Sequence, residues 1–131
     1  MLHEPGERLD GLARDVIGAA LEVHRTLGPG FPEGVYERAL ALELAERRVP
    51  FERQVSLAVR YKGNCVGEWR ADLLVGGALV VELKSVEQLA AVHVAQLVAY
   101  LKAIDCRLGL LINFDVPLLR DGIRRVVQSS H

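Results

Sequence analysis

Apolar side chains recur every three or four residues over the first third of the chain, a spacing that predicts two amphipathic helices. We expect the first helix to begin after an N-cap at Asp10 and to end at Leu27, where Gly-Pro-Gly follows. The second is expected from about Pro32 to about Arg48, before Pro50 breaks the pattern. The apolar positions are Leu12, Val16, Ala19, Ala20, Val23 and Leu27 in the first helix, and Val35, Ala39, Leu40, Leu42 and Leu44 in the second.

Beyond residue 50 the apolar side chains alternate with polar ones, a spacing typical of β-strands. Helical spacing then returns once, and a nearly continuous apolar run follows, as expected of a strand buried on both faces. The predicted elements are strands at 51–61, 65–75 and 79–84, a helix at 90–103, and strands at 106–114 and 123–127.

The helix at 90–103 stands between the third and fourth strands and is long enough to be a crossover connection. Strands joined by such a crossover run parallel, whereas the first three strands are joined by short turns and run antiparallel. With 131 residues, the chain is expected to form one domain over 1–131. The predicted fold class is therefore α/β, a mixed β-sheet flanked by helices.

Three ionisable side chains interrupt the second and third strands, where apolar residues occupy almost every other position. Glu82 and Lys84 are two residues apart and share a face of the third strand. If 76–78 is a three-residue connection, Asp72 falls directly opposite Glu82, and opposed residues of antiparallel strands point to the same side. Two carboxylates and an ammonium would then meet in one patch, suited to a divalent cation and a water. The alternative is a set of strand-end charges that neutralise one another in solvent.

Polar side chains on two helices are further candidates. Glu33 and Tyr36 share a face of the second helix, although the helix dipole alone favours a carboxylate in the first turn and Tyr36 alone would be a packing residue. His93, Gln96 and Tyr100 share a stripe of the third helix. This stripe is either a hydrogen-bonding row beside the carboxylates or the polar edge of a buried helix, with His93 solvated or capping.

Composition narrows the classes of function. Sixteen Lys and Arg against 17 Asp and Glu give a net charge of −1, which argues against a broad non-specific nucleic-acid binder. Cys65 and Cys106 have no metal-ligand spacing and are expected to be buried free thiols. No apolar run is long enough to span a bilayer, and residues 1–9 resemble a loose lead-in rather than a signal region, so a cytoplasmic location is expected.

Several of these residues form a series that resembles a known family. Gly30-x-x-Glu33-x-x-Tyr36 matches the motif that names the GxxExxY proteins, a family of the PD-(D/E)xK nuclease superfamily. The resemblance continues through Asp72, then Glu82-x-Lys84, and covers nearly the whole chain after residue 10. Its later motifs are His93-x-x-Gln96-x-x-x-Tyr100-Leu101 and Leu110-Leu111-Ile112-Asn113-Phe114. Ala71 stands where the superfamily commonly has proline.

The resemblance implies a restriction-endonuclease-like core and a nuclease, a hydrolase that uses Mg²⁺ or Mn²⁺. It implies that Asp72, Glu82 and the Leu83 carbonyl bind the metal, with Glu33 completing the acidic cluster. Lys84 would orient the attacking water or stabilise charge on the phosphate. Gln96 and Tyr100 would position the substrate backbone, and His93 and Tyr36 complete the expected substrate-binding set. The catalytic set is therefore expected to be Asp72, Glu82, Lys84 and Glu33.

Nucleic acid, most simply DNA, is the expected partner, and no membrane is expected. A nuclease-fold protein that binds nucleic acid or a protein partner without cutting is the chief alternative. Because positive charge is sparse, a homodimer or a partner protein is expected to complete the binding surface. A stand-alone interaction module is the third possibility; it rests on an apolar surface near the C-terminus, formed by Leu118, Leu119, Ile123 and Val126.

Overall fold

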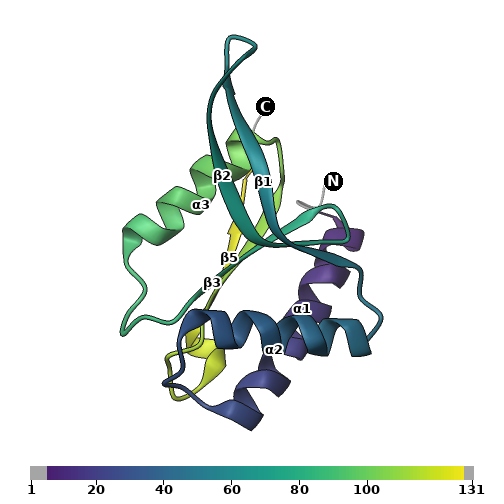
Figure 1. Ribbon diagram of the computed structural model, residues 1–131, viewed down its shortest axis with the longest axis vertical. Helices are drawn as coiled ribbons and strands as arrows, with labels where there is room; N and C mark the ends of the chain where they lie inside the picture. The colour runs from purple at the N-terminus through teal and green to yellow at the C-terminus, as the bar shows by residue number, and fades with distance from the viewer. Residues whose placement is uncertain (1–5, 129–131) are drawn as a thin grey trace.

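The structure, a computed structural model, describes residues 6–128, which form one five-stranded sheet with helices on both faces (Figure 1). The α/β fold class is confirmed. The part of the lead-in at 1–5 lies outside the described residues. The elements are α1 (Glu7–Leu27), α2 (Glu33–Glu46), β1 (Phe51–Tyr61), β2 (Asn64–Val75), β3 (Leu79–Lys84), α3 (Ala91–Ala103), β4 (Leu108–Asn113), the 3₁₀ turn η1 (Leu119–Gly122) and β5 (Ile123–Val127).

The strands lie in chain order across the sheet, β1-β2-β3-β4-β5. Only β3 and β4 pair in parallel within this sheet of the described residues, and α3 connects them, as the crossover predicted. β4 is buried along its whole length, as its continuous apolar run predicted.

The β2–β3 connection has the predicted register. Val75 pairs with Leu79 and Leu73 with Val81, so three residues form the turn. Gly76 and Gly77 have φ of 61° and 67°, a backbone region that glycine enters without penalty. A Cβ at Gly76 would also lie 2.8 Å from a methyl carbon at the end of the Leu12 side chain, which would have to shift to accept it.

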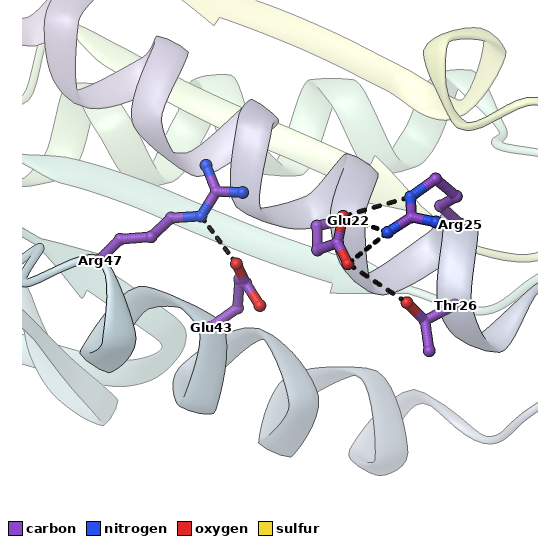
Figure 2. A network of polar contacts seen from close by, with 5 residues as sticks. All are labelled: Glu22, Arg25, Thr26, Glu43 and Arg47. Atoms are coloured by element: carbon purple, nitrogen blue, oxygen red, sulfur yellow. Dashed lines mark hydrogen bonds and ion pairs between the residues drawn. The ribbon is translucent and has the colours of Figure 1, made fainter.

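The two faces of the sheet pack against different helices. α1 and α2 cover one face, where their apolar stripes meet alternate side chains of β2, β3 and β4, among them Leu73, Val81 and Leu110. α3 covers the other face through Leu97 and Leu101. On the outer side of α1 and α2, short ion pairs link Glu22 with Arg25 and Glu43 with Arg47 (Figure 2). Such exposed pairs add little stability, so the buried apolar surface holds these helices on the sheet.

Along the β1–β2 hairpin, alternate side chains change the face of the sheet to which they point. In β2, Leu73 packs in the α1–α2 core while Ala71 packs in the α3 core, although residues two apart on a regular strand share a face. β1 makes the same change between Phe51 and Leu57. The change coincides with Gln54, which has a left-handed φ of 52°. Beyond it the hairpin curls away from the rest of the sheet (Figure 1).

The helices differ from the predictions in two respects. α1 begins at Glu7, and Asp10 is not its N-cap but an ion-pair partner of Arg125. In α2, Leu42 is 69% exposed, whereas Tyr36 and Glu37 are buried. Apolar residues surround much of this helix, so their spacing does not identify the buried stripe.

Two other expectations are corrected. Cys65 is exposed near the tip of the β1–β2 hairpin, because that part of the hairpin has no layer packed on it; Cys106 is partly buried, and both are free thiols. The apolar surface expected near the C-terminus is mostly interior, because Leu119 and Val126 enter the two cores. Only Leu118 of that group is strongly exposed.

Candidate functional site

A pair of carboxylates lies where β2 changes face. One step beyond the Leu73–Val81 pair, the β2–β3 register places Asp72 opposite Glu82. The backbone N–H of Asp72 donates to Glu82 Oε1 (3.0 Å), and the backbone N–H of Leu83 donates to Asp72 Oδ2 (2.8 Å). Each carboxylate is thus hydrogen-bonded to the strand that carries the other, which fixes the two groups side by side.

The electrostatics of the pair disfavour two negative charges. Burial and, after it, the Asp72 carboxylate raise the pKa of Glu82 to about 7, while Lys84 acts in the opposite sense. Burial also raises the pKa of Asp72, against the hydrogen bond from Leu83. Burial raises the pKa of Glu33, and the Asp72 carboxylate raises it further. Glu33, Asp72, Glu82 and Lys84 therefore form one electrostatic cluster, called here the carboxylate cluster.

Glu33 reaches this cluster because the start of α2 is anchored to the end of β3. The Ser85 hydroxyl, just after β3, donates to the Phe31 carbonyl (2.6 Å). The Tyr36 hydroxyl donates to the Gly28 carbonyl (2.6 Å) and accepts from the Phe31 N–H (3.1 Å). Its ring stacks on Phe114 with centroids 4.5 Å apart. These contacts orient the first turn of α2 toward β3.

Tyr36 is consequently not a substrate-binding residue. Its side chain is 0% exposed, and its hydroxyl already has two backbone partners. The expectation of direct substrate contact is corrected: the residue packs in the core and positions Glu33 through the helix that both share.

The structure adds three residues that the sequence motifs did not assign to the site. Glu37, one turn after Glu33, is buried and pairs with Arg53 of β1 (3.1 Å). The Gln54 amide donates to Glu37 Oε1 (2.8 Å) and makes a longer contact with Asp72 Oδ1 (3.4 Å). The four-residue spacing of Glu33 and Glu37 was the available signal, since it places both on one helix face.

The end of β3 is held by Asn113, the last residue of β4. Its side-chain amide donates to the Val86 carbonyl (2.9 Å), and its carbonyl oxygen accepts from the Val86 N–H (3.0 Å). The Phe114 N–H also donates to the Lys84 carbonyl (3.0 Å). Lys84 therefore lies on backbone that is held to the end of β4.

The α3 residues have contacts of their own. His93 Nδ1 accepts from the Ala90 N–H (3.0 Å), so His93 caps its own helix, which was one of the two alternatives. Tyr100 stacks on Trp69 of β2, with ring centroids 4.0 Å apart, and Gln96 is exposed. Among residues 6–128, no hydrogen bond joins α3 to the carboxylate cluster. The structure thus places Tyr100 beside β2, three residues along from Asp72.

The donor set determines which cation fits. Asp72 and Glu82 offer hard oxygen ligands, and burial raises the pKa of both carboxyls although Lys84 acts in the opposite sense. Within the described residues, no group of three His, Cys, Asp or Glu side chains converges closely enough to hold an ion. Two carboxylates suit Mg²⁺, which commonly keeps several waters and uses one or two protein carboxylates. The pair fits such a cation as a two-ligand site.

Glu33, Asp72, Glu82 and Lys84 are all partly buried, so each side chain of the cluster keeps some contact with solvent. No helix of residues 6–128 has the length and apolar character needed to cross a membrane.

Comparisons with known proteins agree with this fold. The family described as the PD-(D/E)XK nuclease superfamily matches residues 10–126. The crystal structure of SSO0001 superposes with a TM-score of 0.53 over 95% of this chain, at 18% sequence identity, and the chain covers 61% of the length of that structure. No curated protein sequence matches the chain. Because the family match spans nearly all of the described residues, the chain belongs to the PD-(D/E)XK nuclease superfamily.

Proposed function

We propose that the protein is a metal-dependent nuclease that hydrolyses phosphodiester bonds of nucleic acid. The observation that carries this proposal is the facing pair Asp72 and Glu82, with the pKa of Glu82 raised to about 7, on a nuclease fold. A half-buried pair of repelling carboxylates destabilises the protein unless a cation binds, so the pair has a functional rather than a structural explanation.

Asp72 and Glu82 hold Mg²⁺ or Mn²⁺ in this proposal, with the Leu83 carbonyl as a further oxygen ligand and Glu33 completing the acidic cluster. When bound, the cation lowers the pKa of its water and polarises a phosphoryl oxygen. Lys84 Nζ donates a hydrogen bond to the attacking water or to the phosphate oxygen that gains charge.

Gln96 and Tyr100 position the nucleic-acid backbone from α3, and His93 orients the first turn of that helix. DNA is the proposed substrate, on the resemblance to the GxxExxY proteins. Since the net charge is −1, one chain attracts duplex weakly over long range, and a second copy or a partner protein supplies the remaining cationic surface. The proposed location is the cytoplasm.

The alternative, a nuclease-fold protein that binds without cutting, is favoured by one observation: three chelating side chains do not converge among residues 6–128. A cleavage assay distinguishes a nuclease from a protein that only binds nucleic acid. We expect the purified protein with Mg²⁺ or Mn²⁺ to cut linear, circular or single-stranded DNA and to stop when the metal is chelated.

Two variants make this assay specific. Lys84→Ala removes the ammonium next to the carboxylates and is expected to lower the rate by about 10²-fold or more. Lys102→Ala removes an exposed ammonium from α3 and serves as the matched control. If binding persists but neither metal supports cleavage by the wild type, the binding function is the correct one.

A further inference from the structure

Gln54 has an unusual backbone conformation for its position. It lies within β1, away from any turn, yet its φ is 52°. A residue with a Cβ rarely adopts this region inside a strand, and such strain persists only where the surrounding structure imposes it. The register on either side, Arg53 with Leu73 and Val55 with Ala71, places Gln54 opposite Asp72. The strain therefore occurs directly opposite a residue of the carboxylate cluster.

The contacts of the side chain explain what imposes the conformation. Glu37 is 6% exposed and accepts at one oxygen from Gln54 (2.8 Å) and at the other from Arg53 (3.1 Å). A buried carboxylate requires such partners, because leaving it unpaired is strongly unfavourable. Glu37 of α2 therefore holds the Gln54 amide toward α2, although Gln54 as a whole stays exposed.

The Gln54 amide makes a second contact, with Asp72. Leu83 N–H occupies Asp72 Oδ2 (2.8 Å), and Gln54 Nε2 approaches Asp72 Oδ1 (3.4 Å). With a donor on each oxygen, the carboxylate plane has a defined orientation, and each oxygen retains a lone pair for another ligand. A continuous path of contacts thus runs from α2 through Glu37 and Gln54 to Asp72.

We infer that Gln54 is a positioning residue that orients the Asp72 carboxylate for cation binding, with Glu37 as its anchor. This inference deepens the proposed function. Its expected effect on metal affinity rests on that function, because it requires that Asp72 binds a cation. Groups that hydrogen-bond to a metal ligand commonly change affinity by 10- to 100-fold when they are removed.

Two substitutions at Gln54 distinguish the effect of losing the side-chain amide from the effect of relieving the backbone strain. Gln54→Ala removes the amide and keeps a Cβ at positive φ, whereas Gln54→Gly removes both. We expect calorimetry to show Mn²⁺ binding weakened about tenfold or more in both variants. Gln54→Gly should unfold at a higher urea concentration than Gln54→Ala, because glycine relieves the strain. Ser56→Ala, in the same strand but bonded to Glu68, is the control and should bind Mn²⁺ like the wild type.

Glu37→Gln tests the anchor. An amide has one acceptor oxygen where the carboxylate had two, so Arg53 and Gln54 can no longer both be satisfied. We expect a smaller loss of Mn²⁺ affinity than in Gln54→Ala, and no additional loss when the two substitutions are combined. Additive losses would show that Glu37 acts on the cation directly and would overturn the anchoring role.

A measurement on the metal-free protein tests the positioning role of Gln54 independently of the proposed nuclease function. The ¹³C resonance of the Asp72 carboxyl should shift in Gln54→Ala and in Glu37→Gln, and should not shift in Ser56→Ala. An unchanged resonance would overturn the positioning role, whether or not the wild type binds Mn²⁺. If the resonance shifts but the wild type neither binds metal nor cuts DNA, the proposed function fails and the positioning role stands.

Discussion

The two faces of the sheet differ in how strongly they are packed. On the α1–α2 face, both helices and the strands contribute fully buried side chains, and the aromatic pair Tyr36–Phe114 is buried at its centre. On the α3 face the helix contributes only Leu97 and Leu101 to the buried set among the described residues. There, the indole N–H of Trp69 is buried without a hydrogen-bond partner in residues 6–128.

The difference matters because the candidate site combines residues from both sides. The carboxylates and Lys84 lie on strands that the larger core fixes, and Glu33 comes from a helix of that core. Gln96 and Tyr100 come from the weakly packed helix. Elements with few buried contacts open more readily, so the side proposed to position the substrate is free to adjust, whereas the proposed cation ligands are not.

Truncating one stacked tyrosine on each face gives the largest expected effect. Tyr36→Ala should lower the free energy of unfolding by about 3–5 kcal/mol, since it empties a buried aromatic site and breaks two hydrogen bonds. Tyr100→Ala should lower it by about 1–2 kcal/mol, because Tyr100 is partly exposed and its main partner is the Trp69 ring. Urea unfolding of both variants measures the contrast, and equal losses would contradict it.

Stability at the border between the faces should depend on pH through Glu82. Its pKa is about 7 in the folded protein against 4.5 without the fold. As the pH rises, the unfolded chain loses this proton first, so the free energy of unfolding falls between about pH 4.5 and 7 and then levels off. The loss from this group is about 3 kcal/mol at most.

Glu82→Gln should remove that pH dependence and make the protein more stable than the wild type at pH 8. Glu87→Gln, an exposed substitution in the loop after β3, is the matched control. Added Mg²⁺ should raise the melting temperature of the wild type at pH 8 and leave that of Glu82→Gln nearly unchanged. A wild type whose stability is flat from pH 4.5 to 8 would remove the electrostatic argument for the site.

The smallest effect comes from a glycine that lets α3 approach the sheet. A Cβ at Gly109 of β4 would lie 3.2 Å from Leu97 and 3.3 Å from Leu101. Gly109→Ala should therefore lower stability by about 1 kcal/mol and speed hydrogen exchange in α3 but not in α1. Gly34→Ala in α2, where a Cβ meets nothing within 4 Å, should be neutral or slightly stabilising. Uniform acceleration in both helices would mean that the faces are not independent.

Much of the fold follows from local patterns. The Gly-Gly turn and the alternation around it predict the β2–β3 register, and with it the facing of Asp72 and Glu82. The crossover rule predicts that β3 and β4 are parallel. These features depend on residues close together in the chain, which is why sequence alone suffices for them.

The change of face in the β1–β2 hairpin could not be predicted in that way. Strand periodicity assumes one conformation throughout, and Gln54 breaks it with a positive φ for which glutamine has no local preference. What stabilises this conformation is the buried Glu37, from another element of the chain. Tyr36 was likewise assigned to the substrate surface, since its burial depends on Phe114, 78 positions later.

The irregular backbone of β1 also disfavours the pairing of another chain's strand with this edge of the sheet. β1 is an edge strand of 11 residues, and a long, flat edge is a template on which another chain can add a strand and begin to aggregate. Positive φ at Gln54 and the register shift between Val59 and Arg60 divide this edge into short segments. None of these segments offers a long uninterrupted row of donors and acceptors to a second molecule. The backbone distortion that brings Gln54 to the carboxylates thus also disfavours aggregation through the open edge of the sheet.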